Sequence, residues 1–349
     1  MILRKKNSPP VIIYRLGSLG DTIVALPCFH KIAEVYSRHE IIVLTNFPIS
    51  SKAIPLEQIL LPMGLIDRSI EYPLGARSFQ ELIRLRKEIK ETGAKTLIYL
   101  NAGRGVLKTY RDILFFYFCG IKKIVGAPIT KNLQNCLVDR TTGELEYETR
   151  RLARTMNFLG VIDLDKPHFW DLNFSEAEIK VATHYAALLE MPHFFVINMG
   201  GKDPKKDWGQ ERWIKLLTAL SRQNSPIGLV VVGASDDAVR AKEVLNIWPF
   251  KKINLCGLLS PRECAAVLSK ASFFIGHDSG PLHLAACVKL RCLGIFGENN
   301  LPKRWHPYGK SHLIFHDIRG VDFISVNDVL VAAQSLIDHS ILSNSICAE

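Results

Sequence analysis

The sequence has no apolar run long enough to cross a membrane. Its longest run, residues 113–121, is far shorter than the roughly 20 residues that a transmembrane helix requires. The apolar stretch near the N-terminus, residues 11–14, is interrupted at once by Arg15, which is not the pattern of a secretory signal peptide. These two absences predict a cytoplasmic protein.

Cysteine pairs of the metal-binding or redox kind are also missing. The chain has eight cysteines and none forms a C-x-x-C pair, so zinc-ribbon and thioredoxin-like sites have little support. Most of the cysteines lie in apolar, periodic segments. We expect buried, reduced thiols, which behave as small apolar side chains.

Acidic residues are few relative to basic ones. The 44 Lys and Arg against 34 Asp and Glu give a formal net charge of +10, which favours an anionic partner. The chain contains no zinc-finger spacing and no RNA-recognition signature, so nucleic acid is not the expected partner. A phosphorylated substrate and an anionic membrane surface both stay open, because charge alone does not separate them.

What is present is the length and composition of a globular protein with two domains. Of the 349 residues, 48% are hydrophobic and 22% are charged. This hydrophobic content separates the chain from disordered proteins, and its length exceeds one ordinary hydrophobic core.

Short apolar runs alternate with segments of helical periodicity in both halves of the chain. Strands are expected at residues 11–14, 40–44, 96–100, 194–199, 228–232, 273–275 and 292–296. Helices are expected from residue 21 to about 38 and at 79–91, 176–189, 213–221, 260–269 and 283–288. Such alternation predicts parallel sheets with crossover helices.

The two halves are separated by a segment rich in Asp, Pro and aromatic residues at 161–174. We therefore predict an α/β protein of two doubly wound, Rossmann-like domains, residues 1–175 and 176–349. Ligands of such sheets bind at the carboxyl ends of the strands, so we expect the domains to face a central cleft there.

The loop after the first strand, RLGSLGDTIVALP, is the first candidate site. Gly17 and Gly20 permit a sharp turn and close approach of a ligand, with Ser18 between them. Asp21 at the helix start either acts on a ligand or merely caps the helix. The glycines are spaced G-x-x-G rather than G-x-G-x-x-G, and no acidic residue follows the second strand, so NAD binding is disfavoured.

The segment FIGHDSGPLHLAA at residues 273–286 is the second candidate. Backbone amides of Ser279 and Gly280, with Pro281 opening the helix, would form a diphosphate site at a helix N-terminus. Asp278 is expected to orient this loop or to accept hydrogen bonds from sugar hydroxyls. His283 donates to a phosphate oxygen or simply packs.

Two weaker loops follow strands of the same half. Lys202, Lys205 and Lys206 lie in GGKDPKKDWGQERW, where they would neutralise the charge on a departing diphosphate unless the loop is only a solvated basic one. Asp236 in VVGASDDA would meet the ribose or base of a nucleotide, or cap the next helix. The D-x-D of Asp163 and Asp165 lies in the segment between the halves and is interpreted as surface, so no metal is predicted.

The chain also contains, in this order, RLGSLGDTIVALP, the step Lys206-Asp207-Trp208, VVGASDDA, LCGLLSPRECAAVLSKASFFIGHDSGPLHLAA and LGIFGENN-LPKRWHPYG. These segments resemble glycosyltransferase family 9, the bacterial ADP-heptose:lipopolysaccharide heptosyltransferases. The resemblance covers nearly the whole chain and is most specific in residues 275–307. Two departures are Ser279-Gly280-Pro281, where many members have Thr-Gly and no proline, and Glu298 in place of a small residue.

The resemblance implies a GT-B fold with the acceptor mainly in the N-terminal domain and an ADP-linked nucleotide sugar in the C-terminal one. It implies an inverting single displacement with neither a metal nor another cofactor. By position, Asp21 corresponds to the general base and Lys206 to the lysine on the donor phosphate. The expected acceptor is a hydroxyl of a lipopolysaccharide core or a related anionic glycan or glycolipid.

A segment rich in basic and aromatic residues is a candidate for contact with that acceptor. Lys108, Arg111, Lys122 and Lys123 flank the aromatic residues 115–118. A basic face suits a phosphorylated saccharide, and exposed aromatics would touch lipid, which leaves peripheral contact with the cytoplasmic face of the inner membrane open. For the aromatics, a buried helix is the interpretation that we favour.

Two other functions are compatible with the same residues. A GT-B-like nucleotide-sugar epimerase would turn over the donor without an acceptor and would need further acid and base groups. A non-catalytic protein that binds sugar nucleotides would show no turnover, and the presence of both Asp21 and Lys206 disfavours it.

Overall fold

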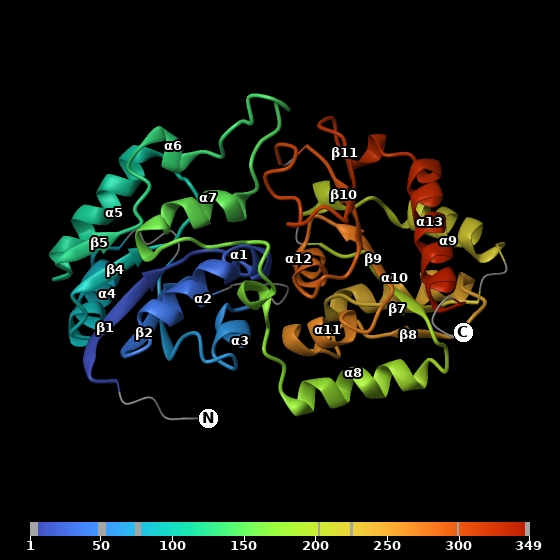
Figure 1. The fold of residues 1–349 in the computed structure, drawn as a ribbon, viewed down its shortest axis with the longest axis horizontal. Helices are drawn as coiled ribbons and strands as arrows, with labels where there is room; N and C mark the ends of the chain where they lie inside the picture. Colours follow the sequence, from blue (N-terminus) through green and yellow to red (C-terminus); the bar gives the residue numbers. More distant parts are fainter. Residues whose placement is uncertain are drawn as a thin grey trace. The chain divides into compact units, whose positions relative to one another are not determined.

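The computed structural model describes residues 6–47, 54–73, 78–201, 203–223, 226–298 and 300–345. The chain divides into two compact units, residues 1–171 and 172–349. Each unit is built on its own parallel sheet (Figure 1).

The sheet of the N-terminal unit has the order β3-β2-β1-β4-β5. Its strands are β1 (Ser8–Tyr14), β2 (His39–Thr45), β3 (Arg68–Glu71), β4 (Thr96–Tyr99) and β5 (Lys123–Val125). Ile12 pairs with Ile42 on one side and with Leu97 on the other, and all three are fully buried. Strand order reverses between β1 and β4, which is where doubly wound sheets bind ligands.

The helices of this unit connect the strands. They are α1 (Leu19–Val24), α2 (Leu26–Val35), α3 (Glu57–Leu60), α4 (Phe79–Glu91), α5 (Val106–Phe118), α6 (Lys131–Gln134) and α7 (Glu148–Thr155), with short 3-10 turns η1 (Asn157–Leu159) and η2 (Pro167–Trp170). The single helix expected up to residue 38 is wrong. Pro27 has no N–H to donate to the carbonyl of residue 23, so the chain forms two helices that meet at Ala25.

The sheet of the C-terminal unit has the order β11-β10-β9-β6-β7-β8. Its strands are β6 (Phe194–Asn198), β7 (Gly228–Val231), β8 (Lys252–Asn254), β9 (Phe273–His277), β10 (Cys292–Phe296) and β11 (Leu313–His316). Here the order reverses between β6 and β9. Strand β9 extends to His277, two residues beyond the expected end, so its last residue brings a histidine to that reversal point.

The helices of the C-terminal unit are α8 (Glu176–Leu188), α9 (Gln210–Ser221), α10 (Ala238–Ile247), α11 (Pro261–Leu268), α12 (Gly280–Cys287) and α13 (Val326–Ser345). Short 3-10 turns η3 (Pro204–Lys206), η4 (Ser235–Asp237) and η5 (Val321–Phe323) lie between them. Helix α11 begins as predicted: the Ser260 hydroxyl accepts from the Glu263 N–H, and Pro261 opens the helix. Helix α12 begins at Gly280, one residue before the Pro281 start expected for the diphosphate turn.

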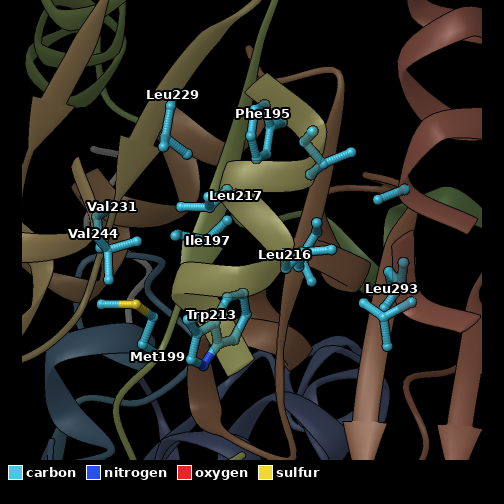
Figure 2. Packing of buried hydrophobic residues seen from close by; sticks show 14 of the residues in the cluster. Phe195, Ile197, Met199, Trp213, Leu216, Leu217, Leu229, Val231, Val244 and Leu293 are labelled. Atoms are coloured by element: carbon cyan, nitrogen blue, oxygen red, sulfur yellow. The ribbon is translucent and has the colours of Figure 1, made fainter. Parts of the chain in front are cut away.

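The core of the C-terminal unit lies between α9 and the sheet. Figure 2 shows Trp213 and Leu217 of α9 over Phe195 and Ile197 of β6, and all four side chains are fully buried. Burial of each such side chain contributes about 1.5–3 kcal/mol. This apolar block holds the strand ends that carry the polar loops described below.

The start of the C-terminal unit is held by a buried arginine of α11. The Arg262 guanidinium donates to the carbonyl oxygens of Leu172 (2.8 Å) and Asn173 (3.1 Å) and to the Glu178 carboxylate (2.6 Å). Arg262 is 2% exposed, so these acceptors replace its water. Residues 172–178 are therefore part of the C-terminal unit.

The structure confirms the predicted fold class: two α/β units, each with a doubly wound parallel sheet. It also confirms that most cysteines are buried, with Cys347 outside the described residues. Burial raises the pKa of Cys28 and of Cys264 to about 12, so both stay protonated. Within the described part of the chain, no helix has the length and apolarity that a bilayer crossing requires.

Candidate functional site

In the N-terminal unit, Asp21 lies in the first turn of α1 and closes the loop that follows β1. Its Oδ2 accepts from the backbone N–H of Ser18 (2.8 Å) and from the Ser18 hydroxyl (3.1 Å). The side chain is half-buried, so it lies neither in the apolar core nor fully in solvent. Asp21 therefore fills the capping role that the sequence left open beside a role on a ligand.

Gly17 is the residue that permits this arrangement. Its φ is +149°, and a Cβ placed on it would lie 2.4 Å from the Cβ of Asp21. A larger residue would therefore displace the carboxylate. Gly20 lies within the first turn of α1, between Leu19 and Asp21.

Two asparagines tie the ends of three strands together around this loop. Asn46, directly after β2, accepts from the Gly17 N–H at 2.8 Å. Asn101, after β4, accepts from the Leu16 N–H at 2.6 Å and donates to the Tyr14 carbonyl at 3.1 Å. The loop that carries Asp21 is thus fixed on both sides at the reversal point of the sheet.

A buried arginine lies beneath the same loop. Arg15 is 1% exposed and donates to the backbone carbonyls of Leu100 (3.0 Å) and of Asp21. Burial lowers the pKa of Arg15, and the Asp21 carboxylate is the strongest of the charges that oppose this shift. Arg15 therefore bridges β4 and the first turn of α1.

In the C-terminal unit, a lysine and an aspartate meet at the reversal point between β6 and β9. The Nζ of Lys206, at the end of η3, lies 2.7 Å from Oδ2 of Asp278, which follows β9. Asn300 donates to the same Asp278 oxygen. The sequence predicted both residues for one site, and the structure brings them together.

The turn after β9 leads directly into α12. Ser279 is the N-cap residue, Gly280 and Pro281 form the first helical positions, and the Ser279 hydroxyl donates to Oδ1 of Asn198 at 3.0 Å. The hydroxyl therefore contacts Asn198 at the end of β6. The N-terminal end of α12 and the Lys206 ammonium both favour negative charge at this place.

Behind the turn lies a buried histidine. His277 is fully buried, and its Nε2 accepts from the Trp208 N–H at 3.1 Å. Burial lowers the pKa of His277 to about 4, so the ring is neutral near pH 7. This contact connects β9 to the residues that follow Lys206.

Three further histidines lie near the turn. His283 of α12 is buried, in agreement with the packing role weighed for it. His306 and His316 are joined by a ring-nitrogen contact of 2.8 Å, and their rings lie 4.7 and 5.7 Å from that of Phe296. Burial and the neighbouring His316 lower the pKa of His306 to about 3.

The other residues that the sequence predicted to bind the sugar donor lie in different surroundings. Asp236 is exposed in η4, after β7, whereas Asp237 is buried and accepts from the Ala234 N–H at 2.9 Å. Lys202 lies outside the described residues. Lys205 pairs with Glu298 at 2.8 Å, so the unusual glutamate of the β10 loop is directed toward a lysine.

The D-x-D segment lies away from these loops in the sequence and on the surface. Asp163 and Asp165 are both exposed, and the Asp165 N–H donates to the Asp163 side chain at 3.1 Å. Across the part of the chain that the structure describes, no group of three or more His, Cys, Asp or Glu is arranged to hold a metal ion.

Several residues of both sites were missed at the level of sequence: Arg15, Asn46, Asn101, Asn198 and Asn300. Three of the asparagines shared a signal in the sequence, because each lies at the end of a buried strand. Asn198 is the last residue of β6, Asn46 follows β2 directly, and Asn101 lies two residues after the end of β4. Arg15 directly follows an apolar run in the same way. Asn300 gave no such signal, since it lies in a loop well after β10.

Comparison with known proteins places the chain in a recognised group. A family model described as "Glycosyltransferase family 9 (heptosyltransferase)" matches residues 114–321. "Lipopolysaccharide heptosyltransferase 3" of Escherichia coli K12 is 27% identical over 198 residues, which are 51% of this chain and 56% of that protein. The match thus spans little more than half the length of that curated relative.

Two solved structures extend the similarity to the whole fold. The family 9 glycosyltransferase of Veillonella parvula has a TM-score of 0.69 at 19% identity, covering 97% of this chain and 99% of the other. The E. coli heptosyltransferase WaaC with ADP has a TM-score of 0.63 at 15% identity, covering 94% and 99%. These values establish a shared fold, in agreement with the predicted GT-B class.

Proposed function

The chain belongs to glycosyltransferase family 9, and from this premise we propose that it is an inverting, metal-independent glycosyltransferase. Its donor is a nucleotide-diphosphate sugar, ADP-heptose, and its acceptor is a hydroxyl of a lipopolysaccharide core or a related anionic surface glycan. The names of the matched relatives support the sugar, and the structure of WaaC with ADP supports the nucleotide.

The observation that carries this proposal is the pairing of Lys206 with Asp278 at the reversal point of the C-terminal sheet. A lysine ammonium and the N-terminal end of α12 both attract a diphosphate. The Asp278 carboxylate, which is paired with this lysine, would repel a phosphate. It can instead accept hydrogen bonds from the hydroxyls of the sugar. This division favours a donor with a diphosphate at one end and a polyol at the other.

In the proposed reaction, an acceptor oxygen attacks the anomeric carbon from the face opposite the diphosphate. The bond from the acceptor oxygen to that carbon forms, the bond from the carbon to the phosphate oxygen breaks, and ADP leaves. Asp21 takes the acceptor proton, which requires a carboxylate within hydrogen-bond reach.

Lys206 and the first turn of α12 supply the positive field that the departing diphosphate needs. Loss of one such electrostatic donor commonly lowers the rate by roughly a hundredfold to a thousandfold. Because these groups neutralise the developing charge, we propose that the reaction needs no divalent ion. Activity that persists in EDTA would agree with this, and activity restored only by added Mg²⁺ or Mn²⁺ would contradict it.

The decisive experiment mixes the purified protein with ADP-heptose and a truncated lipopolysaccharide core, and measures both released ADP and the mass of the glycolipid. We expect ADP release that depends on the acceptor, with the acceptor heavier by one heptose and the anomeric configuration inverted by NMR. Conversion of the donor without an acceptor would instead indicate the epimerase. Donor binding without any turnover, under all acceptors tried, would indicate a non-catalytic binding protein.

A further inference from the structure

Helix α5 of the N-terminal unit presents an apolar stripe to the outside. Leu107 is 86% exposed, Leu114 is 59% exposed and Phe118 is 73% exposed, with Tyr110 and Tyr117 also exposed. These positions follow helical spacing and fall on one side of the helix. The sequence-based preference for buried aromatics is therefore wrong for Tyr117 and Phe118 and right for Phe116.

The opposite side of α5 already has its packing partners. Thr109, Asp112 and Phe116 are its buried residues, and the Phe116 ring lies 4.9 Å from that of Tyr14 on β1. The helix end is fixed as well, because Arg86 of α4 donates to the Phe118 carbonyl at 3.0 Å. The outward apolar stripe is thus not required for packing within this unit.

The charges around the stripe are of one sign. Lys108 and Arg111 are exposed on α5, and Lys122 and Lys123 are exposed just after it. Between Val106 and Lys123 the only acidic residue is Asp112, which is buried and shared by Arg104 (2.6 Å) and Arg111 (2.8 Å). One carboxylate between two guanidinium groups leaves this surface positive.

We propose that the outer face of α5 rests on the surface of a bilayer that contains anionic lipids. Leu107, Leu114 and Phe118 enter the boundary between headgroups and acyl chains, and the two tyrosines lie at the headgroup level, where aromatic side chains with a polar tip are favoured. The lysines at positions 108, 122 and 123 meet the lipid phosphates.

Charge favours lipid over a second copy of the chain as the occupant. A symmetric dimer through α5 would bring the same lysines of two chains of net charge +10 against one another. An anionic lipid surface complements those charges instead. This inference concerns attachment only and does not depend on which sugar the protein transfers.

Sedimentation with vesicles tests the proposal without any need for turnover. The full chain is mixed with vesicles of phosphatidylcholine alone, or of phosphatidylcholine and phosphatidylglycerol at roughly seven to three, at low and high salt. We expect binding to the anionic vesicles only, weakened by salt. Absence of binding to the anionic vesicles would overturn the proposal.

Two sets of variants locate the contact. The triple variant Leu107→Ser, Leu114→Ser, Phe118→Ser is expected to lower vesicle affinity by roughly tenfold or more. The set Lys108→Gln, Lys122→Gln, Lys123→Gln is expected to lower it by roughly fivefold for each lysine removed. Equal binding of either set and the unaltered chain would show that α5 is not the attachment surface.

Matched controls come from exposed residues elsewhere in the chain. Val161→Ser, Val239→Ser, Val331→Ser removes three apolar side chains that are also well exposed, and Lys180→Gln, Lys242→Gln, Lys310→Gln removes three exposed lysines. Both control sets should bind as the unaltered chain does, and circular dichroism with thermal melting shows that every variant is folded. Light scattering tests whether a second copy of the chain covers this face instead. A protein that is dimeric, becomes monomeric in the α5 serine variant and does not bind vesicles would assign the face to self-association and refute the lipid contact.

Discussion

The ammonium of Lys206 lies 2.7 Å from the carboxylate of Asp278, although 72 positions of sequence separate the two residues. Asp278 is the more enclosed partner, since its side chain is 10% exposed against 26% for Lys206. The lysine is therefore held at the end of β9 by a residue of that strand's own loop, beside the start of α12.

Replacement of Lys206 by alanine is predicted to weaken ADP binding and to lower kcat. The ammonium attracts the diphosphate and stabilises the charge that it gains on leaving, so we expect a rate loss of roughly a hundredfold to a thousandfold. Calorimetric titration with ADP and the glycolipid assay measure the two effects. Lys205→Ala is the matched control, because that lysine pairs with Glu298 on the surface, and a similar loss there would contradict the assignment to Lys206.

Asp21→Asn is predicted to abolish most turnover while leaving ADP affinity unchanged. The amide retains an oxygen for the Ser18 N–H, so the start of α1 should lose at most about 1 kcal/mol. The amide is not a base at neutral pH, so the acceptor proton has no receiver. Full activity of this variant would remove Asp21 from the proposed role.

The control for Asp21 is another carboxylate in the same capping geometry. Glu263 accepts from the Ser260 N–H at 2.8 Å at the start of α11, away from both candidate sites in the sequence. Glu263→Gln should change the melting temperature about as much as Asp21→Asn and should leave turnover intact. This pair of variants separates capping from catalysis.

Arg15→Met is predicted to destabilise the N-terminal unit and to lower turnover. The variant removes the donor of the Leu100 carbonyl, at about 1–3 kcal/mol for a buried group left unpaired, and one of two donors of the Asp21 carbonyl, which keeps the Ala25 N–H. Chemical denaturation measures the stability, and the glycolipid assay measures the rate. If Arg15 positions the Asp21 loop, kcat should fall with ADP affinity unchanged, and Arg15→Lys should recover part of it.

The buried histidines make stability depend on pH. The pKa of His277 is lowered to about 4, from an ordinary value of about 6.5, so the unfolded chain binds the proton more readily. The contribution is present above about pH 6.5 and is lost as the pH falls toward about 4, by about 1.4 kcal/mol for each pH unit. Thermal melts from about pH 7.5 down to about pH 4.5 should show this decline.

His277→Gln tests whether that decline belongs to this residue. The glutamine Oε1 can still accept from the Trp208 N–H but takes up no proton in this range. We expect a lower stability near neutral pH and a flatter dependence below it. An unchanged slope would assign the pH effect to other groups, of which His306 is the first to test because its pKa is also lowered.

The strands that the sequence predicted are those that the sheet buries on both sides. Strand β10 was predicted with its observed bounds, because Cys292 to Phe296 form a continuous apolar run. The edge strands β3, β5, β8 and β11 were missed. Each has only three or four residues, and none is buried along its whole length.

Site residues could be predicted from the sequence where they lie in a loop directly after a strand. They could not be predicted where a later loop brings a residue back to the site. Asp278 and Lys206 were both named because each lies in a loop after a buried strand. Asn300 comes to Asp278 through a loop whose path no local pattern records. The outward face of α5 was misjudged because periodicity shows that a helix has an apolar stripe, but not whether another element covers it.

Arg262 has a consequence for any attempt to produce the C-terminal unit alone. A fragment that begins at residue 176 would lack the carbonyl oxygens of Leu172 and Asn173, and a guanidinium that is 2% exposed would lose two of its acceptors. A fragment that begins at or before Leu172 keeps them. Both fragments keep the Glu178 carboxylate, so the guanidinium stays paired, but the shorter fragment gives up two hydrogen bonds to a buried cation and is expected to melt at a lower temperature.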